Sequence, residues 1–133
     1  MKKIETIMKD MTLDFFGQGK HKVNPAALLV ASDAVFLDVR SPEENDAVSF
    51  SLKPLLPVLC IPINEIPDRI DEIPTDKTVG VFCSGGTRAA IVYLYLQSRG
   101  YEKVRIVEGS IADLVQELKP GKVLKLRSAS SAQ

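Results

Sequence analysis

The chain has 133 residues, of which 45% are hydrophobic and 26% charged, so its length and balance suit one globular domain and exclude a disordered chain. Basic and acidic residues both number 17, so net charge favours neither nucleic acid nor a membrane as a partner, although it does not exclude a local positive site. No apolar run approaches the roughly 20 residues that span a bilayer. Two cysteines suffice neither for a disulfide framework nor for a metal-binding motif, so we expect a cytoplasmic protein with reduced thiols.

Residues 1–22 are expected to form an N-terminal extension that packs on the following domain or precedes it. Acidic and basic residues interrupt every hydrophobic stretch within it, so we expect no secretory signal. The only histidine of the sequence, His21, stands between two lysines. It is expected to be solvated, since a single histidine makes no metal site.

The following domain is expected to cover residues 23–126. It begins with a predicted helix over residues 24–32, where an asparagine can act as the cap and a proline occupies the first helical position. Residues 34–39 then form an apolar run of strand length that is interrupted only by Asp38. Such a run is typical of a strand that is buried on both faces.

A second helix is expected to begin after Ser41, which can cap it while Glu44 completes a capping box. The apolar segment 48–57 has no clear period and contains two prolines, so we expect a long loop that either covers the core or receives a partner protein. The remaining predicted elements are, in chain order, a strand over 58–63, a short helix over 66–74, a strand over 77–83, a helix over 86–100, a strand over 103–109, a helix over 110–119 and a C-terminal tail over 127–133.

Strands that alternate with helices over short turns predict an α/β fold with a mainly parallel central sheet and helices on both faces. In such sheets ligands bind beyond the carboxyl ends of the strands, where loops meet helix N-termini. Cys83 and Asp38 both stand at or near such ends. This edge of the sheet is therefore the expected place of a functional site.

From Cys83 the chain reads Cys-Ser-Gly-Gly-Thr-Arg and then enters the predicted helix. Gly85 and Gly86 permit backbone angles that turn consecutive N–H groups inward, so this loop can form an anion nest at the helix N-terminus. Such a nest favours the thiolate form of a cysteine, and Arg88 would add a positive charge at the rim. We therefore expect Cys83 to be reactive, the alternative being a buried structural cysteine beside an ordinary turn.

At these residues the chain resembles the rhodanese-homology domain family, whose active-site loop reads Cys-x-x-Gly-x-Arg followed by Ser or Ala. Cys83, Gly86, Arg88 and Ala89 match this pattern in register. The stretch "FLDVRSPEE" (36–44) is similar to the family's Leu-Asp-Val-Arg-x-x-x-Glu, and "VRIVEGSIADL" (104–114) is similar to its last strand and final helix. The resemblance covers about residues 23–118 and implies a single rhodanese-like domain.

By that resemblance, Cys83 would accept the outer sulfur of a small anionic donor such as thiosulfate and carry it as a persulfide to a thiol or protein acceptor. Arg88 would orient the anionic donor, and no metal or organic cofactor is implied. Asp38 could tune the site, but a structural role as the partner of a loop N–H or an arginine is favoured for it. The active-site loop implied by the resemblance comprises Ser84, Gly85, Gly86, Thr87 and Arg88.

Two other functions are considered for the same residues. A persulfide relay or protein-binding module would carry sulfur between proteins with little thiosulfate turnover. This alternative arises because "SFSLKPLLPVLCIPI" (49–63) replaces the family's Gly-His-Ile-x-Gly-Ala segment and has neither His nor Gly. A phosphatase or arsenate reductase of the same fold is disfavoured, since such phosphatases carry Cys-x5-Arg, whereas four residues separate Cys83 from Arg88 here.

Three further polar residues are expected to be structural. Arg40 and Glu108 are interpreted as framework charges that can pair with each other. Cys60 lies in a predicted strand and could in principle resolve a persulfide on Cys83 as a disulfide. Nothing in its sequence surroundings favours the thiolate form of Cys60, so the structural interpretation is preferred.

Overall fold

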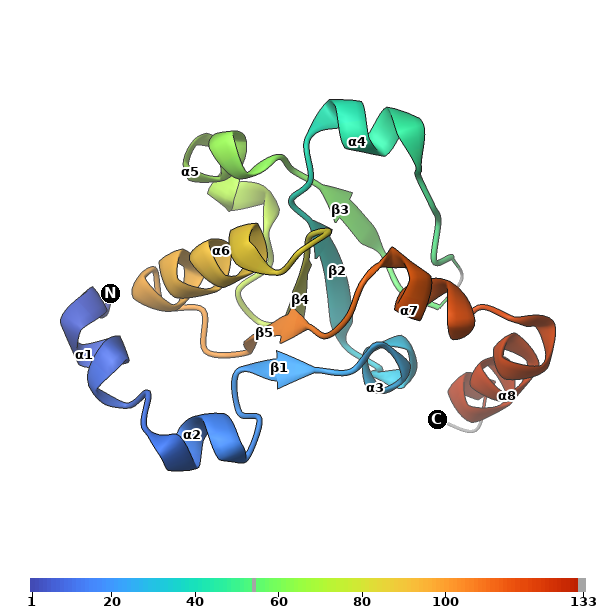
Figure 1. Cartoon of the computed structure of the whole chain (residues 1–133), viewed down its shortest axis with the longest axis horizontal. Coiled ribbons are helices and arrows are strands. Elements are labelled where there is room, and N and C mark those ends of the chain that lie inside the picture. The colour runs from blue at the N-terminus through green and yellow to red at the C-terminus, as the bar shows by residue number, and fades with distance from the viewer. Residues whose placement is uncertain (54, 132–133) are drawn as a thin grey trace.

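The computed structural model describes residues 1–53 and 55–131 (Figure 1). Its centre is a five-stranded sheet of order β1-β5-β4-β2-β3 in which every neighbouring pair is parallel. The expected α/β fold with a parallel central sheet is therefore confirmed. The strands are β1 (Lys22–Val23), β2 (Ala34–Asp38), β3 (Val58–Cys60), β4 (Thr78–Phe82) and β5 (Val104–Val107). The helices are α1 (Ile4–Lys9), α2 (Leu13–Gly17), α3 (Pro25–Val30), α4 (Pro42–Ala47), α5 (Ile66–Arg69), α6 (Thr87–Ser98), α7 (Ile111–Gln116) and α8 (Pro120–Ser131), with single 3-10 turns at Ile63–Glu65 and Ile70–Glu72.

Side chains of β2 alternate between two hydrophobic clusters, one on each face of the sheet. Val35 and Leu37 belong to the cluster that contains residues of α6, and Ala34 and Phe36 belong to the cluster that contains residues of α3 and α7. Every residue of β2 is buried, as the apolar run in the sequence predicts for a strand covered on both faces. Asp38 is in register with Phe82 of β4, so these two strands end side by side.

The described part of segment 48–57 covers the second of these clusters. Leu52 and Leu56 are buried within it. The ring of Phe50 lies edge-on to those of Phe36 and Phe82, with centroid separations of 5.5 and 6.0 Å. Of the two expectations for this segment, the structure shows the one in which it covers the core.

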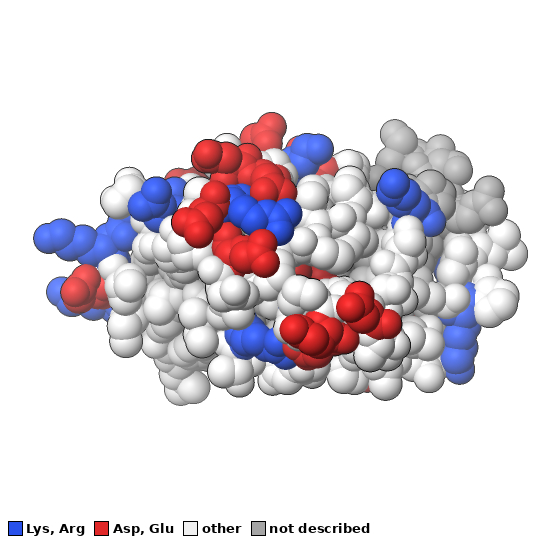
Figure 2. Space-filling model, turned by 90° about the horizontal axis from the view of Figure 1, so that it is seen from above, with Lys and Arg blue, Asp and Glu red and all other residues white. Residues whose placement is uncertain are grey.

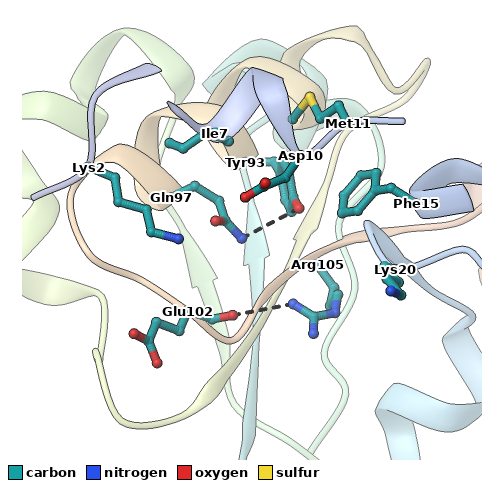
Figure 3. Close-up of a pocket in the computed structure, with 10 residues that line it drawn as sticks. All are labelled: Lys2, Ile7, Asp10, Met11, Phe15, Lys20, Tyr93, Gln97, Glu102 and Arg105. Atoms are coloured by element: carbon teal, nitrogen blue, oxygen red, sulfur yellow. Dashed lines mark hydrogen bonds between the residues drawn. The ribbon is translucent and has the colours of Figure 1, made fainter. Parts of the chain in front are cut away.

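The N-terminal extension docks against α6 and then joins the edge of the sheet through β1 (Figure 1). The Lys2 N–H donates to the Ser98 carbonyl at 3.0 Å, and Ile7 is buried. Between the extension and the domain lies a cavity of about 300 Å³, which contains none of the sequence-predicted site residues (Figure 3). Tyr93 of α6 lines this cavity, and Gln97 donates a long hydrogen bond of 3.4 Å to its hydroxyl.

The prediction that His21 is solvated holds only in part, because the residue is half-buried. Its ring packs near those of Phe15 and Phe16, with centroid separations of 5.8 and 5.0 Å, and its Nδ1 atom is buried without a hydrogen-bond partner in the described part of the chain. Burial, and then the charge of Lys22, lowers the pKa of His21 and favours the neutral ring. Neighbouring side chains along the chain point in different directions, so the two lysines beside His21 do not show whether its ring faces solvent.

The C-terminal part forms two helices where the sequence favoured one helix followed by a tail. α7 ends at Gln116, and α8 begins at Pro120. Proline suits the first position of a helix, because the N–H that it lacks has no acceptor within the helix there. α8 continues to Ser131 and buries Leu126 against the second cluster. Residues 132–133 of the expected tail lie outside the described residues. Among the described helices, none has the length and apolar character needed to cross a membrane.

Gly80 of β4 provides the first test of this packing. A Cβ atom added there would lie 2.5 Å from a methyl carbon of Leu28 in α3 and 3.0 Å from one of Val107. Both neighbours are buried and have little room to move. Gly80→Ala should therefore lower the free energy of unfolding by about 1–3 kcal/mol in urea denaturation. Gly17→Ala, where an added Cβ meets nothing within 4 Å, is the control. Equal stability of Gly80→Ala and the unmodified protein would contradict this packing.

Candidate active site

Cys83 lies directly after β4, at the start of the turn into α6. Its side chain is buried, with 3% of the residue exposed, and its Sγ accepts hydrogen bonds from the N–H groups of Gly86 at 3.0 Å and Ala89 at 3.3 Å. The Ala89 N–H belongs to the first turn of α6 and has no acceptor within the helix. The sulfur therefore caps the helix, a role that the glycine at the N-cap position cannot fill with a side chain.

The backbone of the loop turns at one of its two glycines. Gly86 has φ +89° and ψ −22°, a left-handed conformation that strains residues with a side chain. Gly85 does not have a positive φ, so the expectation that both glycines supply special angles holds only for Gly86. The turn at Gly86 directs its own N–H towards the sulfur.

The surroundings of the Cys83 sulfur favour negative charge. Two main-chain N–H groups point at it, and it lies at the positive end of the dipole of α6, a helix of 12 residues. Donated hydrogen bonds stabilise an anionic acceptor more than a neutral one. The geometry therefore suits a thiolate or the terminal sulfur of a persulfide.

Arg88 is held by a carboxylate that sequence reasoning did not assign to the site. Its Nη1 and Nη2 donate to the two carboxylate oxygens of Glu44, at 2.5 and 2.9 Å, and Nη2 also donates to the Ser84 hydroxyl at 3.0 Å. The hydrogen bonds from Arg88, and then those from Ser41, keep the pKa of Glu44 well below its ordinary value. The Ser41–Glu44 capping box predicted from the sequence is also present.

Glu44 could have been recognised from the spacing of the family-like stretch in residues 36–44, which ends at this carboxylate. Its place in the capping box is enough to explain a glutamate at this position, so the local sequence does not indicate the second contact with Arg88. The Arg88–Glu44 contact joins residues that are 44 positions apart. Only the parallel pairing of β2 with β4 brings their following segments together.

Asp38 and Arg40 form a buried pair beside the loop, each with 1% exposed side chain. Arg40 donates from Nη2 to Asp38 Oδ2 at 2.8 Å, and from its backbone N–H and Nε to Oδ1, each at 3.0 Å. The structural interpretation of Asp38 is thus the one that the contacts support. The expected pairing of Arg40 with Glu108 is wrong, because Glu108 lies on β5's side of the sheet and pairs with Lys22 at 2.7 Å.

Two cavities lie along this edge of the sheet. One of about 350 Å³ is lined by the exposed loop residues Ser84, Gly85 and Gly86 and by the segments around His21 and Glu108. Cys60 lines a different cavity, of about 550 Å³, and its Sγ lies 4.0 Å from Asn45 Oδ1. Desolvation, and then the charge of Asp38, raises the pKa of Cys60, so its thiolate is disfavoured.

Comparison with known sequences places the chain in a family. The sequence model of the Rhodanese-like domain matches residues 25–117, so the chain belongs to the rhodanese-like domain family. A sulfurtransferase of Allochromatium vinosum is 33% identical over 79 residues, which are 59% of this chain and 69% of that protein. A tRNA sulfurtransferase of Shewanella loihica is 32% identical over 77 residues, which are 58% of this chain and 16% of that much longer protein.

Solved structures agree with this assignment. A rhodanese-related protein from Thermoplasma volcanium superimposes with a TM-score of 0.62 and 29% identity, covering 75% of this chain and 95% of the other. An NAD-dependent persulfide reductase from A. fulgidus superimposes with a TM-score of 0.58 and 36% identity, covering 75% of this chain and 17% of the other. The part of that enzyme that this chain matches is thus about one sixth of its length.

Gly85 and Gly86 should tolerate a side chain to different degrees, because only Gly86 of the two has a positive φ. Gly86→Ala meets no steric obstacle but places a side chain at positive φ, which costs about 1–2 kcal/mol and moves the N–H away from Cys83. Gly85→Ala has neither problem and is the matched control. We expect Gly86→Ala to slow alkylation of Cys83 by iodoacetamide at neutral pH and Gly85→Ala to leave the rate near that of the unmodified protein. Equal rates for both variants would contradict the role of the Gly86 N–H.

The Arg88–Glu44 pair should also make stability depend on pH. Because the pKa of Glu44 is lower in the folded state than its ordinary value of 4.5, the contribution of the pair is present above pH 4.5 and is lost as the pH falls below it. Urea denaturation should therefore show the unmodified protein more stable than Glu44→Gln at neutral pH, with the difference shrinking below pH 4.5. A difference that stays constant across this range would contradict an ionised contact.

Proposed function

We propose that the chain is a sulfurtransferase that moves a sulfane sulfur from a donor such as thiosulfate to a thiophilic acceptor through a persulfide on Cys83. The observation that supports this most is the pair of main-chain N–H groups at the Cys83 sulfur, at 3.0 and 3.3 Å. Membership of the rhodanese-like domain family agrees with the proposal. Sulfurtransferases are among the relatives of the chain.

The reaction has two displacement steps at Cys83. In the first, its thiolate attacks the outer sulfur of the donor, the donor's S–S bond breaks, and the bonding electron pair leaves with the inner sulfur, as sulfite when the donor is thiosulfate. In the second, an acceptor thiolate or cyanide attacks the terminal sulfur of the persulfide, and the electron pair of the broken S–S bond returns to Cys83. Both steps begin and end with an anionic sulfur in the same loop.

The residues of the loop have distinct proposed roles in these steps. We assign the hold on the anionic sulfur to the backbone N–H groups from Ser84 through Thr87 and Arg88 to Ala89, and we place the Arg88 side chain at the rim of the loop, where it pairs with Glu44. The cavity beside Ser84 and Gly85 gives the donor or acceptor a path to the loop. Asp38 supports the site through Arg40, whose backbone and side chain it fixes at the end of β2.

A persulfide relay between protein partners is the second candidate. It is supported by the small share that this chain covers of the tRNA sulfurtransferase and the persulfide reductase, 16% and 17%, where the similar segment is one part of a longer protein. The family's Gly-His-Ile-x-Gly-Ala segment is also absent from residues 49–63, which changes the wall near a small donor. In a relay, Cys83 would hold the sulfur in the same loop, and the donor and acceptor would be protein thiols.

Intact-mass measurement tests whether Cys83 takes up sulfur. After exposure to thiosulfate and removal of the reagent, the protein should gain the mass of one sulfur atom, and a reductant should remove it. The gain should be at Cys83, whose sulfur is the one that accepts main-chain N–H groups within residues 1–53 and 55–131. Cys83→Ser should show no gain, and Cys60→Ser should behave like the unmodified protein. Sulfur uptake that persists in Cys83→Ser and disappears in Cys60→Ser would contradict the assignment. Phosphoester hydrolysis that is lost in Cys83→Ser would support a phosphatase instead.

A comparison of two assays separates the small-donor enzyme from the relay. If the chain turns over small donors, cyanide-dependent thiosulfate turnover should proceed at a rate comparable to sulfur transfer from a persulfidated donor protein. A relay should give fast transfer from the protein and little thiosulfate turnover. Because the nucleophile is the same, Cys83→Ser should lower both rates by at least about a thousandfold. Retention of either activity in that variant would contradict the shared mechanism.

A further inference from the structure

The guanidinium of Arg88 is not free to receive an anionic donor. Two of its nitrogens donate to the two carboxylate oxygens of Glu44, and one of them also donates to Ser84 Oγ. This two-point contact is the strongest arrangement an arginine makes with a carboxylate, and it cancels the charge of the guanidinium at the lip of the loop. An incoming anion must either displace Glu44 or approach a neutral pair.

The second arginine at this edge is also neutralised. Arg40 has 1% exposed side chain, and its Nη2 donates to Asp38 at 2.8 Å and to Asn45 at 3.1 Å. It therefore lies too deep to meet a donor, and its charge is balanced by Asp38. Lys22, which lines the cavity beside the loop, is likewise paired, with Glu108 at 2.7 Å. Of the positive features near Cys83 in the described part of the chain, the main-chain N–H groups and the dipole of α6 remain for an anion.

The rim on the α4 side carries an excess of negative charge. α4 contains Glu43, Glu44 and Asp46 and no basic residue. It lies above the carboxyl ends of β2 and β3, on the same side of the molecule as the turn into α6 (Figure 1). Figure 2, which looks down on this side, shows acidic and basic side chains next to one another over the middle of the molecule.

From these contacts we propose that Glu44 is a specificity-determining residue, which disfavours dianionic donors and adapts the site to donors of lower negative charge. The proposal rests on the proposed sulfur transfer at Cys83 and names its donor class: organic persulfides or thiosulfonates whose remaining part carries no second negative charge. Glu44 acts through Arg88 and through its own charge, and it does not touch the reacting sulfur.

The chemistry of the donors explains the preference. In thiosulfate, two negative charges enter the site together, and the sulfonate end remains at the lip, near Ser84 and Glu44, while the outer sulfur meets Cys83. In an organic persulfide, the anionic sulfur enters the N–H groups, and a neutral or cationic remainder faces the acidic rim. The S–S bond that breaks and the electron pair that leaves with the inner sulfur are the same in both cases, so the difference lies in donor binding.

The test compares two donors that differ by one charge. Thiosulfate and methanethiosulfonate both present a transferable outer sulfur, but methanethiosulfonate has a methyl group in place of one charged oxygen. Each is assayed for sulfur transfer to cyanide with the unmodified protein, Glu44→Gln and Glu43→Gln. Glutamine at position 44 keeps an oxygen for Arg88 and still completes the capping box with Ser41, so the loop is retained while the charge is lost.

The ratio of kcat/KM for thiosulfate to kcat/KM for methanethiosulfonate is the quantity to follow, because it cancels any general change in the reactivity of Cys83. Removing the Glu44 charge should raise this ratio about tenfold, chiefly through a lower KM for thiosulfate. Glu43→Gln removes a neighbouring carboxylate that makes no ion pair in the described part of the chain, and it should change the ratio by less than about twofold.

Three outcomes would count against the account, and they differ from one another. An unchanged ratio in Glu44→Gln would overturn the proposal. An equal rise in both variants would also overturn it, since the effect would then follow total charge and not the contact with Arg88. Failure of every donor to add sulfur to Cys83 by intact mass, in all three proteins, would contradict the proposed sulfur transfer itself. Sulfur loading of Glu44→Gln by methanethiosulfonate shows that its loop is intact.

Discussion

The N-terminus of α6 is capped by the sulfur of Cys83, and the rest of the site depends on the hydrogen bonds that this sulfur accepts. A helix N-terminus presents N–H groups that have no acceptor within the helix, and most helices meet them with a side-chain oxygen at the N-cap. Here the N-cap is Gly86, and the acceptor is Cys83 Sγ, three residues earlier. A weak acceptor in this position is better satisfied when it is charged, so helix capping and anionic sulfur chemistry favour the same arrangement.

The sheet places this turn beside a rigid partner. β2 and β4 run parallel and end in register, which sets the Asp38–Arg40 pair next to the start of the Cys83 loop. Arg40 also lies over the rings of Phe50 and Phe82, at 5.4 and 5.7 Å from their centroids. A charge buried to this degree is tolerated because Asp38 balances it, Asn45 accepts a further hydrogen bond and two aromatic rings lie against it. The pair thereby fixes the end of β2, from which the chain enters α4 and brings Glu44 to Arg88.

Local patterns predicted those features that depend on local physics. The apolar run at 34–39, the capping residues Asn24 and Ser41, and the glycine after α6 could be interpreted from neighbouring residues alone, because caps and buried strands have short-range signatures. The reactive position of Cys83 followed from a strand end, a glycine-rich turn and a helix start that occur within seven residues.

Features set by distant parts of the chain were missed. The Arg88–Glu44 contact depends on which strands are neighbours, and neither composition nor the residues next to Arg88 contain that information. The order β1-β5-β4-β2-β3 separates Arg40, after β2, from Glu108, after β5, by the whole width of β4. The same order also explains a contribution from the N-terminal extension, which lies outside the family match. The extension ends in β1, next to β5, and its His21 therefore lines the cavity beside the Cys83 loop.

The most direct measurement of the central claim is the NMR amide proton–nitrogen correlation spectrum of the protein before and after sulfur is loaded on Cys83. If the main chain holds the sulfur, the amide resonances of Gly86 and Ala89 should shift most, together with those of the intervening residues, and a reductant should restore them. Loaded protein in which these two amides keep their positions, while resonances elsewhere move, would contradict the account.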